Sequence, residues 1–251
     1  MTSTEYTAVL LLSSLSCLTT ILGVVLALWL QRNDRAVATG IGFSAGIMCL
    51  ISLMELIPEA SAVIGLQKAM LFALSGAILL WLIHIILPHT HLVKEKGIIN
   101  SGAVKSVYLV VIGLILHDVP EGFAMAHAYV ASPSLGVFVA IAIALHNLPE
   151  EFALCIPAVT LKSRRFLFGV ALLSALAEPF GALLGLLAIE MAPVLSPYFL
   201  AFAGGAMIFV SIHELIPLAR RYGFPWHFTG GIVLSMVVYR LLAVIVAGVD
   251  I

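Results

Sequence analysis

Two nine-residue stretches of the chain combine the residue types that bind divalent metal ions. Residues 116–124 read LHDVPEGFA and residues 145–153 read LHNLPEEFA, with six of nine positions identical at an offset of 29. In each stretch a His precedes a Glu by four positions, so on a helix both side chains share one face, one turn apart. Asp118 and Asn147, directly after the His residues, each add an oxygen ligand. Two such helices could enclose a divalent cation.

Buried negative charge is the second sign of an ion site. Five carboxylates lie well inside apolar stretches: Asp118, Glu121, Glu150, Glu151 and Glu178. An ionised, unpaired carboxylate in a bilayer costs about 2.5–3.5 kcal/mol, so five would cost on the order of ten kcal/mol or more. Arg240 is the only basic residue deep in an apolar segment and cannot neutralise them all. The missing positive charge must come from bound cations, from protons or from both, which predicts an ion pathway.

Each of the two stretches also contains a proline. Pro120 and Pro149 each remove one helical hydrogen bond, which frees the carbonyls of Leu116 and Leu145 beside the His residues. In lipid such freed groups need another partner, and a hydrated cavity or a metal would supply one. The alternative is a structural kink alone; the pairing of proline with His and Glu in both copies favours the site.

The composition identifies an integral membrane protein. Hydrophobic residues make up 62% of the 251 positions, charged residues only 10%, and the mean hydropathy is +1.17. A net charge of −1 offers no argument for binding nucleic acid. The three cysteines all lie in apolar stretches, so we expect small buried side chains rather than disulfides. The first apolar run lacks a preceding basic region and is interpreted as a spanning helix, not a signal peptide.

Apolar stretches near the ~20 residues that a bilayer requires predict an all-α fold with eight transmembrane helices. One domain, residues 1–251, would hold helices at about 6–30, 36–58, 69–87, 106–130, 134–160, 166–191, 197–219 and 226–248. Ten of the twelve basic residues fall on one side of this arrangement: Arg32, Arg35, Lys94, Lys96, Lys105, Lys162, Arg164, Arg165, Arg220 and Arg221. Lys68 is the only one in a connection on the other side. By the positive-inside rule, both termini are expected to be non-cytoplasmic.

Inverted internal repeats are also predicted. Residues 42–60 match residues 201–219 at nine of nineteen positions, an offset of 159. These are the second and seventh segments, an odd number of steps apart, so the copies would cross the bilayer in opposite directions. The adjacent fourth and fifth segments are inverted for the same reason. Helices 1–3 are therefore expected to relate to helices 6–8, and helix 4 to helix 5, a pattern typical of transporters.

The two His-x-x-Pro-Glu stretches resemble the paired metal motifs of the ZIP (ZRT/IRT-like) divalent-metal transporters, most closely the short bacterial-type branch. Residues 174–179, SALAEP, are similar to the carboxylate motif of that family's sixth helix. The resemblance implies a first metal site of His117, Glu121, His146 and Glu150, and a second of Asp118, Asn147 and Glu178 bridged by the two Glu. It also implies metal transport toward the cytoplasm by alternating access, a homodimer, and a plasma or bacterial inner membrane.

This chain departs from the commonest family pattern at two positions. Asp118 stands where Asn is usual, and Glu151 stands where Gly often follows the second Pro-Glu. Both changes add negative charge, which leaves the metal preference open; Glu151 either faces the pathway or pairs elsewhere. Imidazoles and carboxylates without thiolates suit Zn²⁺, Fe²⁺, Mn²⁺, Co²⁺ or Cd²⁺ better than Cu⁺. We expect zinc as the main cargo and no prosthetic group.

Other polar residues are weaker candidates. They are His213 and Glu214 near the cytoplasmic end, Glu55 and Glu59 near the outer end, and His89 and His91 in the loop after the third segment. The first four could be exit and entrance ligands or interfacial polar caps, and the loop pair could bind metal or simply be solvated. Three further histidines are expected to be packed or interfacial: His84, His127 and His227.

Two rival functions use the same residues. An intramembrane metalloenzyme could hold a hydrolytic zinc, but the sequence has no His-Glu-x-x-His helix, and only Glu151 could serve as its general base. An exchanger could instead pass protons or another cation. Flux across sealed vesicles, compared with cleavage of peptide or lipid, would separate transport from hydrolysis.

Overall fold

The structure is a computed structural model that describes residues 2–30, 33–86, 118–160 and 164–248. Within these ranges the chain is helical and contains no β-strand. Seven of the described helices are long and apolar enough to cross a membrane. Residues 118–131, the described part of the predicted fourth segment, are helical as well and are called helix 118–131 below. The predicted all-α membrane fold is confirmed; the count of eight spans stays a prediction.

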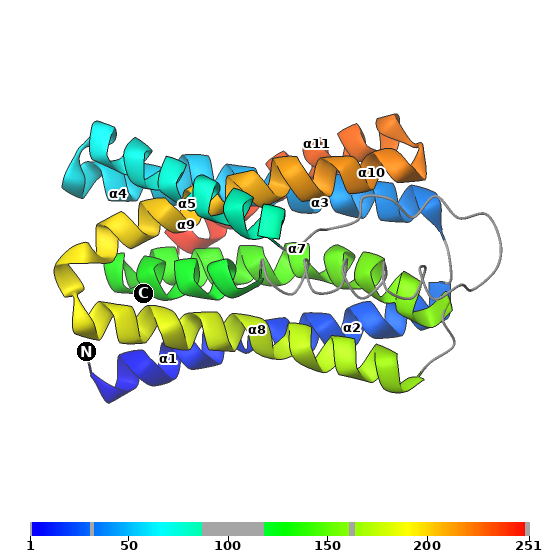
Figure 1. Cartoon of the computed structure of the whole chain (residues 1–251), viewed down its shortest axis with the longest axis horizontal. Helices are drawn as coiled ribbons and strands as arrows, with labels where there is room; N and C mark the ends of the chain where they lie inside the picture. The colour runs from blue at the N-terminus through cyan, green and yellow to red at the C-terminus, as the bar shows by residue number, and fades with distance from the viewer. Residues whose placement is uncertain (1, 31–32, 87–117, 161–163, 249–251) are drawn as a thin grey trace.

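The elements follow one another along the chain as short and long helices (Figure 1). Before helix 118–131 they are α1 (Ser3–Ser13), α2 (Leu15–Leu30), α3 (Asp34–Ile51), η1 (Ser52–Leu56), α4 (Ile57–Ile64) and α5 (Leu66–Ile86). After it come α7 (Pro133–Thr160), α8 (Arg164–Met191), η2 (Pro193–Leu195), α9 (Ser196–Val210), η3 (Ser211–Leu215), α10 (Ile216–Tyr222) and α11 (Pro225–Ala247).

Local sequence explains where several helices begin and end. Thr2 and Glu5 form a capping box at the start of α1, and the Asn33 side chain accepts a hydrogen bond from the amide of Ala36 at the start of α3. The first predicted span is broken at Ser14 into α1 and α2. The second continues six residues beyond its predicted end, because Pro58 falls in the first turn of α4, where its missing amide hydrogen is not needed.

The helices pack in two groups that meet along α3 and α7. In the first group α2 packs against α7 and α8, and helix 118–131 lies against α8. In the second group α3 packs mainly against α11, and α5 against α9. In Figure 1 α3, α4, α5, α10 and α11 occupy the upper part and α1, α2 and α8 the lower part, with α7 between them.

Two π-helical turns interrupt the long helices at matching places. They span Ser52–Leu56 and Ser211–Leu215, and so lie 159 residues apart, the offset of the sequence repeat. Figure 1 shows α3 and α9, which lead into these turns, running in opposite directions along the bundle. π-Turns inside helices often occur at functional sites. The symmetry relating helices 1–3 to helices 6–8 as a whole stays a prediction.

The ends of the bundle differ in charge as the sequence predicts. The start of α1 and the end of α11 lie together at one end, on the left of Figure 1. The starts of α3 and α8 and the end of α10, which carry Arg35, Arg164 and Arg220, lie at the other. Which of these ends faces the cytoplasm follows from the positive-inside rule and stays a prediction.

Candidate metal centre

Three buried residues from two helices form the centre of the candidate site. Glu121 lies on helix 118–131, and His146 and Glu150 lie one turn apart on α7. One ligand atom from each residue lies within 4.8 Å of the others, a spacing that could hold a metal ion. The three residues are 0%, 0% and 6% exposed. The sequence predicted these three together with His117, which lies outside the described residues.

Hydrogen bonding fixes which nitrogen of His146 carries the proton. Nδ1 lies 2.9 Å from the carbonyl oxygen of Ala142, one turn earlier on α7. A carbonyl only accepts, so Nδ1 must donate, and in the neutral ring the lone pair on Nε2 is left toward the site. That Nε2 lies 3.1 Å from Oε1 of Glu121. A neutral imidazole and a carboxylate then meet as two acceptors, an arrangement that requires a proton or a metal ion between them.

Helix α3 supplies a hydrogen bond beside this centre, and one oxygen of Glu121 is left without a partner in it. Ser44 donates to the carbonyl of His146 at 2.8 Å, beside the kink that Pro149 was predicted to introduce. The second oxygen of Glu121 is buried and has no hydrogen-bond partner among the described residues. A buried carboxylate oxygen of this kind needs a donor or a cation.

A second group of polar residues lies beside the first and joins α2, helix 118–131, α7 and α8. The amide of Asn147 donates to Oε1 of Glu178, while its own Oδ1 has no partner among the described residues. The hydroxyl of Ser174 contacts Oδ2 of Asp118 at 2.9 Å and also Oε1 of Glu151. Asp118, Asn147 and Glu178 are the residues that the family resemblance implied for a second ion.

Glu151, whose role the sequence left open, points into this second group. Thr20 of α2 donates to its Oε1 at 3.1 Å, and Ser174 contacts the same oxygen. Since Ser174 has one hydroxyl hydrogen, it can donate to either Glu151 or Asp118 but not to both at once. Ser174 stands one turn before Glu178 and could have been found by that spacing; no pattern in the sequence indicates Thr20.

Two glycines allow helix 118–131 and α8 to approach closely enough to bring these acids together. A Cβ on Gly122 would lie 2.0 Å from the carbonyl oxygen of Glu178, and a Cβ on Gly181 would lie 2.1 Å from that of Val119. Any side chain at either position would push the helices apart. This contact sets Asp118 and Glu121 against Glu178.

The resulting centre has a deficit of positive charge. All five predicted carboxylates are buried, each at most 6% exposed. The Lys and Arg side chains whose burial is described, Arg35, Lys68, Arg220 and Arg240, are all exposed. Five ionised acids at this depth would be strongly destabilising without cations, so the site is built to hold protons or metal ions.

The remaining predicted residues lie apart from this centre. Tyr239 of α11 donates its hydroxyl to Glu55 in the first π-turn. In the second π-turn Glu214 contacts Nδ1 of His84 at 3.3 Å, and the ring of His213 lies 4.6 Å from that of His84. Glu59 lines a cavity of about 220 Å³. His89 and His91 lie outside the described residues.

His127, expected to be packed, is fully buried. Its Nδ1 lies 2.8 Å from the hydroxyl of Ser196, and its ring packs against Phe123 and Phe199. His84, also expected to be packed or interfacial, contacts Glu214, a carboxylate from a distant part of the sequence.

A bundle of apolar helices that buries imidazole and carboxylate side chains at its centre is a multi-pass membrane protein with a candidate ion site. Comparison with known proteins makes this class specific. The model of the ZIP Zinc transporter family matches residues 86–246. The chain belongs to the ZIP family.

Individual relatives are similar over most of their length. The zinc transporter GufA of Myxococcus xanthus is 40% identical over 174 residues, 67% of each chain. The zinc transporter ZupT of Chlorobium luteolum is 34% identical over 260 residues, covering 94% of this chain and 97% of that protein. ZupT of Stenotrophomonas maltophilia is 35% identical over 223 residues, covering 82% and 83%.

Proposed function

We propose that this protein carries divalent metal ions across the membrane toward the cytoplasm, with Zn²⁺ as its main cargo. The observation that carries the proposal is the contact between Nε2 of His146 and Glu121, two acceptors 3.1 Å apart at the centre of the bundle. A metal ion bound there would satisfy both groups and the unpartnered second oxygen of Glu121. The names of the relatives, all zinc transporters, support the same cargo.

The first ion would be bound by Glu121, His146 and Glu150, with His117 as a further ligand from the residue before helix 118–131. A second ion would be bound by Asp118, Asn147 and Glu178, with Glu121 and Glu150 shared between the two. Oxygen donors dominate the second site, which favours Mn²⁺ or Fe²⁺ there, and we place Co²⁺ and Cd²⁺ within the range of the first.

Transport requires that these ligands replace the hydration shell of the ion and then release it to the other side. We infer alternating access around this centre, with ions arriving past Glu55 and Glu59 and leaving past His213 and Glu214. The partnership of Glu214 with His84 supports an exit role, because a half-buried carboxylate beside two imidazoles is a weak metal site from which an ion can leave. Glu151 would line the second site.

The setting of this function is proposed from the family and the charge pattern. We expect a homodimer in a plasma or bacterial inner membrane, with both termini non-cytoplasmic. We expect no prosthetic group and no hydrolytic activity, since the relatives are named as zinc transporters.

The test is zinc flux into sealed proteoliposomes that enclose a fluorescent zinc indicator. We expect wild-type protein to fill the vesicles with zinc, and His146→Ala to reduce the initial rate by at least about tenfold, since loss of metal-site residues costs this much or more. Glu5→Gln, which removes an exposed carboxylate from α1, is the matched control and should transport at the wild-type rate.

Wild-type flux through a correctly folded His146→Ala protein would remove the proposal. A zinc-dependent cleavage of peptide or lipid without any flux would replace transport with hydrolysis. Inward zinc flux that requires an outward proton gradient would make the protein an exchanger built on the same site.

A further inference from the structure

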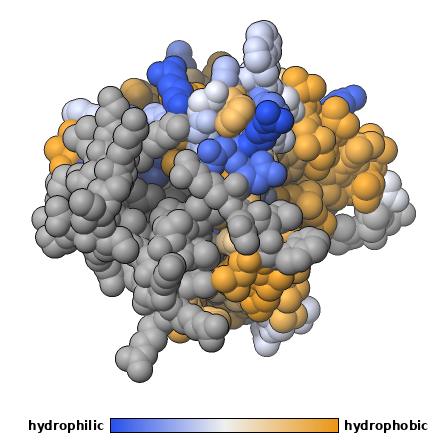
Figure 2. Space-filling model, turned by 90° about the vertical axis from the view of Figure 1, so that its right-hand side faces the viewer, coloured by the Kyte–Doolittle hydropathy of each residue, from blue (hydrophilic) through white to orange (hydrophobic). Residues whose placement is uncertain are grey.

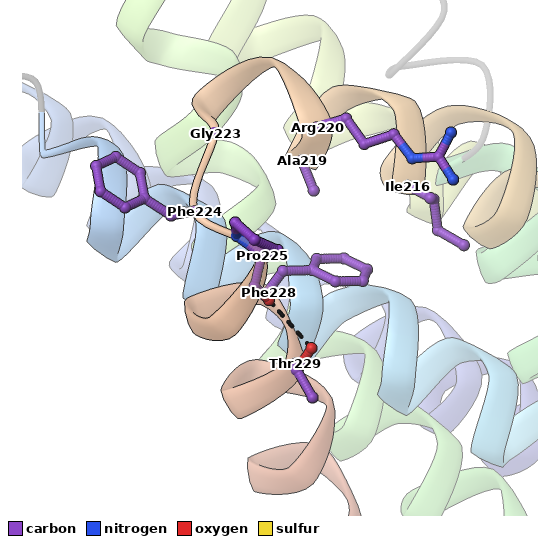
Figure 3. Close-up of a pocket in the computed structure, with 8 residues that line it drawn as sticks. All are labelled: Ile216, Ala219, Arg220, Gly223, Phe224, Pro225, Phe228 and Thr229. Atoms are coloured by element: carbon purple, nitrogen blue, oxygen red, sulfur yellow. Dashed lines mark hydrogen bonds between the residues drawn. The ribbon is translucent and has the colours of Figure 1, made fainter.

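A cavity of about 410 Å³ opens where α10 ends and α11 begins, far from the metal centre along the chain. It is lined by Ile216, Ala219, Arg220, Gly223, Phe224, Pro225, Phe228 and Thr229. Figure 3 shows Arg220 and Ile216 of α10 on one side and Phe228 of α11 on the other. Nothing in the transport mechanism uses these residues.

The lining of this cavity is amphipathic. Its walls are apolar, and Arg220, which is exposed, is the one charged side chain among the lining residues. The hydroxyl of Thr229 already donates to the carbonyl of Pro225 at 3.0 Å. The cavity therefore suits a molecule with an apolar body and an anionic group.

A second guanidinium is held beside the cavity. The guanidinium carbon of Arg35, at the start of α3, lies 5.6 Å from the centre of the Phe224 ring. This cation–π contact fixes the arginine next to a lining residue without using its five N–H donors. Figure 3 shows the side chains of Arg220 and Phe224 pointing to opposite sides, so Arg35 adds positive charge near the cavity, and Arg220 is the lining residue that can bind phosphate, in a bidentate manner.

The side chains next to the cavity are those expected where lipid headgroups meet an apolar bundle. Trp226, directly after the lining residue Pro225, is 84% exposed, and further along α11 Val233 and Val237 are exposed as well. Tryptophan gathers at the membrane interface, with aliphatic side chains deeper in the bilayer. Figure 2 looks onto this end of the molecule and shows hydrophilic residues gathered in its upper part beside an apolar surface.

We propose that this cavity binds an anionic phospholipid, with its phosphate at Arg220 and its first acyl carbons against Ile216 and Phe228. The guanidinium of Arg220 would repel a metal ion, and a soluble anion would leave the apolar walls in water. Basic pockets between transmembrane helices bind anionic headgroups in this way. The site does not depend on the proposed transport function.

The test is native mass spectrometry of the delipidated full-length protein in detergent, titrated with phosphatidylglycerol or with zwitterionic phosphatidylcholine. We expect phosphatidylglycerol to bind in preference and Arg220→Gln to weaken it about fivefold, the contribution of one arginine near an anionic lipid. Thr229→Phe, which fills the cavity from an exposed position, should also weaken binding. Thr229→Val and Lys68→Gln, an exposed lysine on α5, are the controls and should bind as wild type.

Equal binding of the two lipids, or wild-type binding by Arg220→Gln and Thr229→Phe, would overturn the proposal. Complete displacement of the lipid by inorganic phosphate would reduce the site to one for a free anion. A dimer that binds no lipid and dissociates on Arg220→Gln substitution would assign this surface to a second copy of the chain.

Discussion

The candidate site residues form a central cluster and two clusters at the π-turns. The central cluster differs from the other two in the groups that lie against its carboxylates. At the π-turns each carboxylate contacts a side chain that is able to donate a hydrogen bond: the hydroxyl of Tyr239 donates to Glu55, and Nδ1 of His84 lies 3.3 Å from Glu214. In the centre His146 turns its Nε2 toward Glu121, and its only ring hydrogen in the neutral form is used by Ala142.

This difference separates acids that the fold can satisfy from acids that need a cation. The π-turn acids are partly exposed, with the side chain of Glu214 at 16%, whereas Glu121 is fully buried. A partly exposed carboxylate with a donor is stable by itself, and a buried one facing another acceptor is not. We therefore expect an ion to bind most strongly at the centre and to pass the π-turn clusters on its way.

The largest expected effect is the contrast between removing one negative charge at the centre and removing one at a π-turn. Glu121→Gln takes away a ligand and the negative charge beside His146, so zinc flux should fall by about a hundredfold. Glu55→Gln keeps an acceptor for Tyr239, and its flux should stay within about twofold of wild type. Proteoliposome assays on both proteins measure the contrast. Equal losses would mean that the two regions bind the ion equally.

The second effect concerns the close contact that brings the acids together. Gly122→Ala forces helix 118–131 away from α8, and such overpacking typically costs 1–3 kcal/mol, so we expect about that loss in stability together with weaker zinc binding. Gly230→Ala on α11 is the control, because a Cβ there meets nothing within 4 Å. Thermal unfolding with and without zinc measures both quantities. If Gly122→Ala bound zinc as wild type does, the helix contact would not be needed for the site.

The third effect is a dependence on pH. Protons compete with metal for the Nε2 lone pair of His146, and a free imidazole takes its proton near pH 6.5. Lowering the pH from 7.5 to 5.5 should therefore reduce the initial zinc flux. Flux should be measured with equal pH on both sides of the vesicle. A rate that rises toward acid pH would contradict competition at the centre.

The smallest effect concerns hydroxyl groups that support the acids. Ser174→Ala removes a donor shared by Asp118 and Glu151, so flux should change by about two- to threefold, the effect of one neutral hydrogen bond. Tyr239→Phe removes the donor of Glu55, which is only partly buried, and should change flux less. The ability of Mn²⁺ to inhibit Zn²⁺ flux in the same assay should change for Ser174→Ala and stay the same for Tyr239→Phe. A larger effect of Tyr239→Phe would reverse the comparison.

Much of the centre could be predicted from sequence because its ligands recur within two helices. The spacing of His146 and Glu150 places them one turn apart, and the repeat of that spacing identified Glu121 as their partner. Burial of charged residues in apolar segments pointed to the same positions. These features depend on helix geometry and on the free-energy cost of placing a charged side chain in a membrane. Both can be judged from the sequence alone.

What sequence could not predict depends on how separate helices meet. Thr20 reaches Glu151 only because α2 packs on α7, and His84 reaches Glu214 only because of the way α5 packs against the helix that contains the second π-turn. The closeness of Gly122 to the backbone of Glu178 likewise belongs to the contact between two helices. The π-turns were missed as well, since an inserted residue leaves no distinct pattern in an apolar helix.

The most direct test is to locate zinc by anomalous X-ray scattering in crystals of the full-length protein grown with the metal. The account predicts a strong peak bounded by Nε2 of His146 and carboxylate oxygens of Glu121 and Glu150, at about 2.0–2.2 Å from each. A peak confined to the π-turn clusters, or a centre in which His146 still bonds Glu121 directly at saturating zinc, would contradict it.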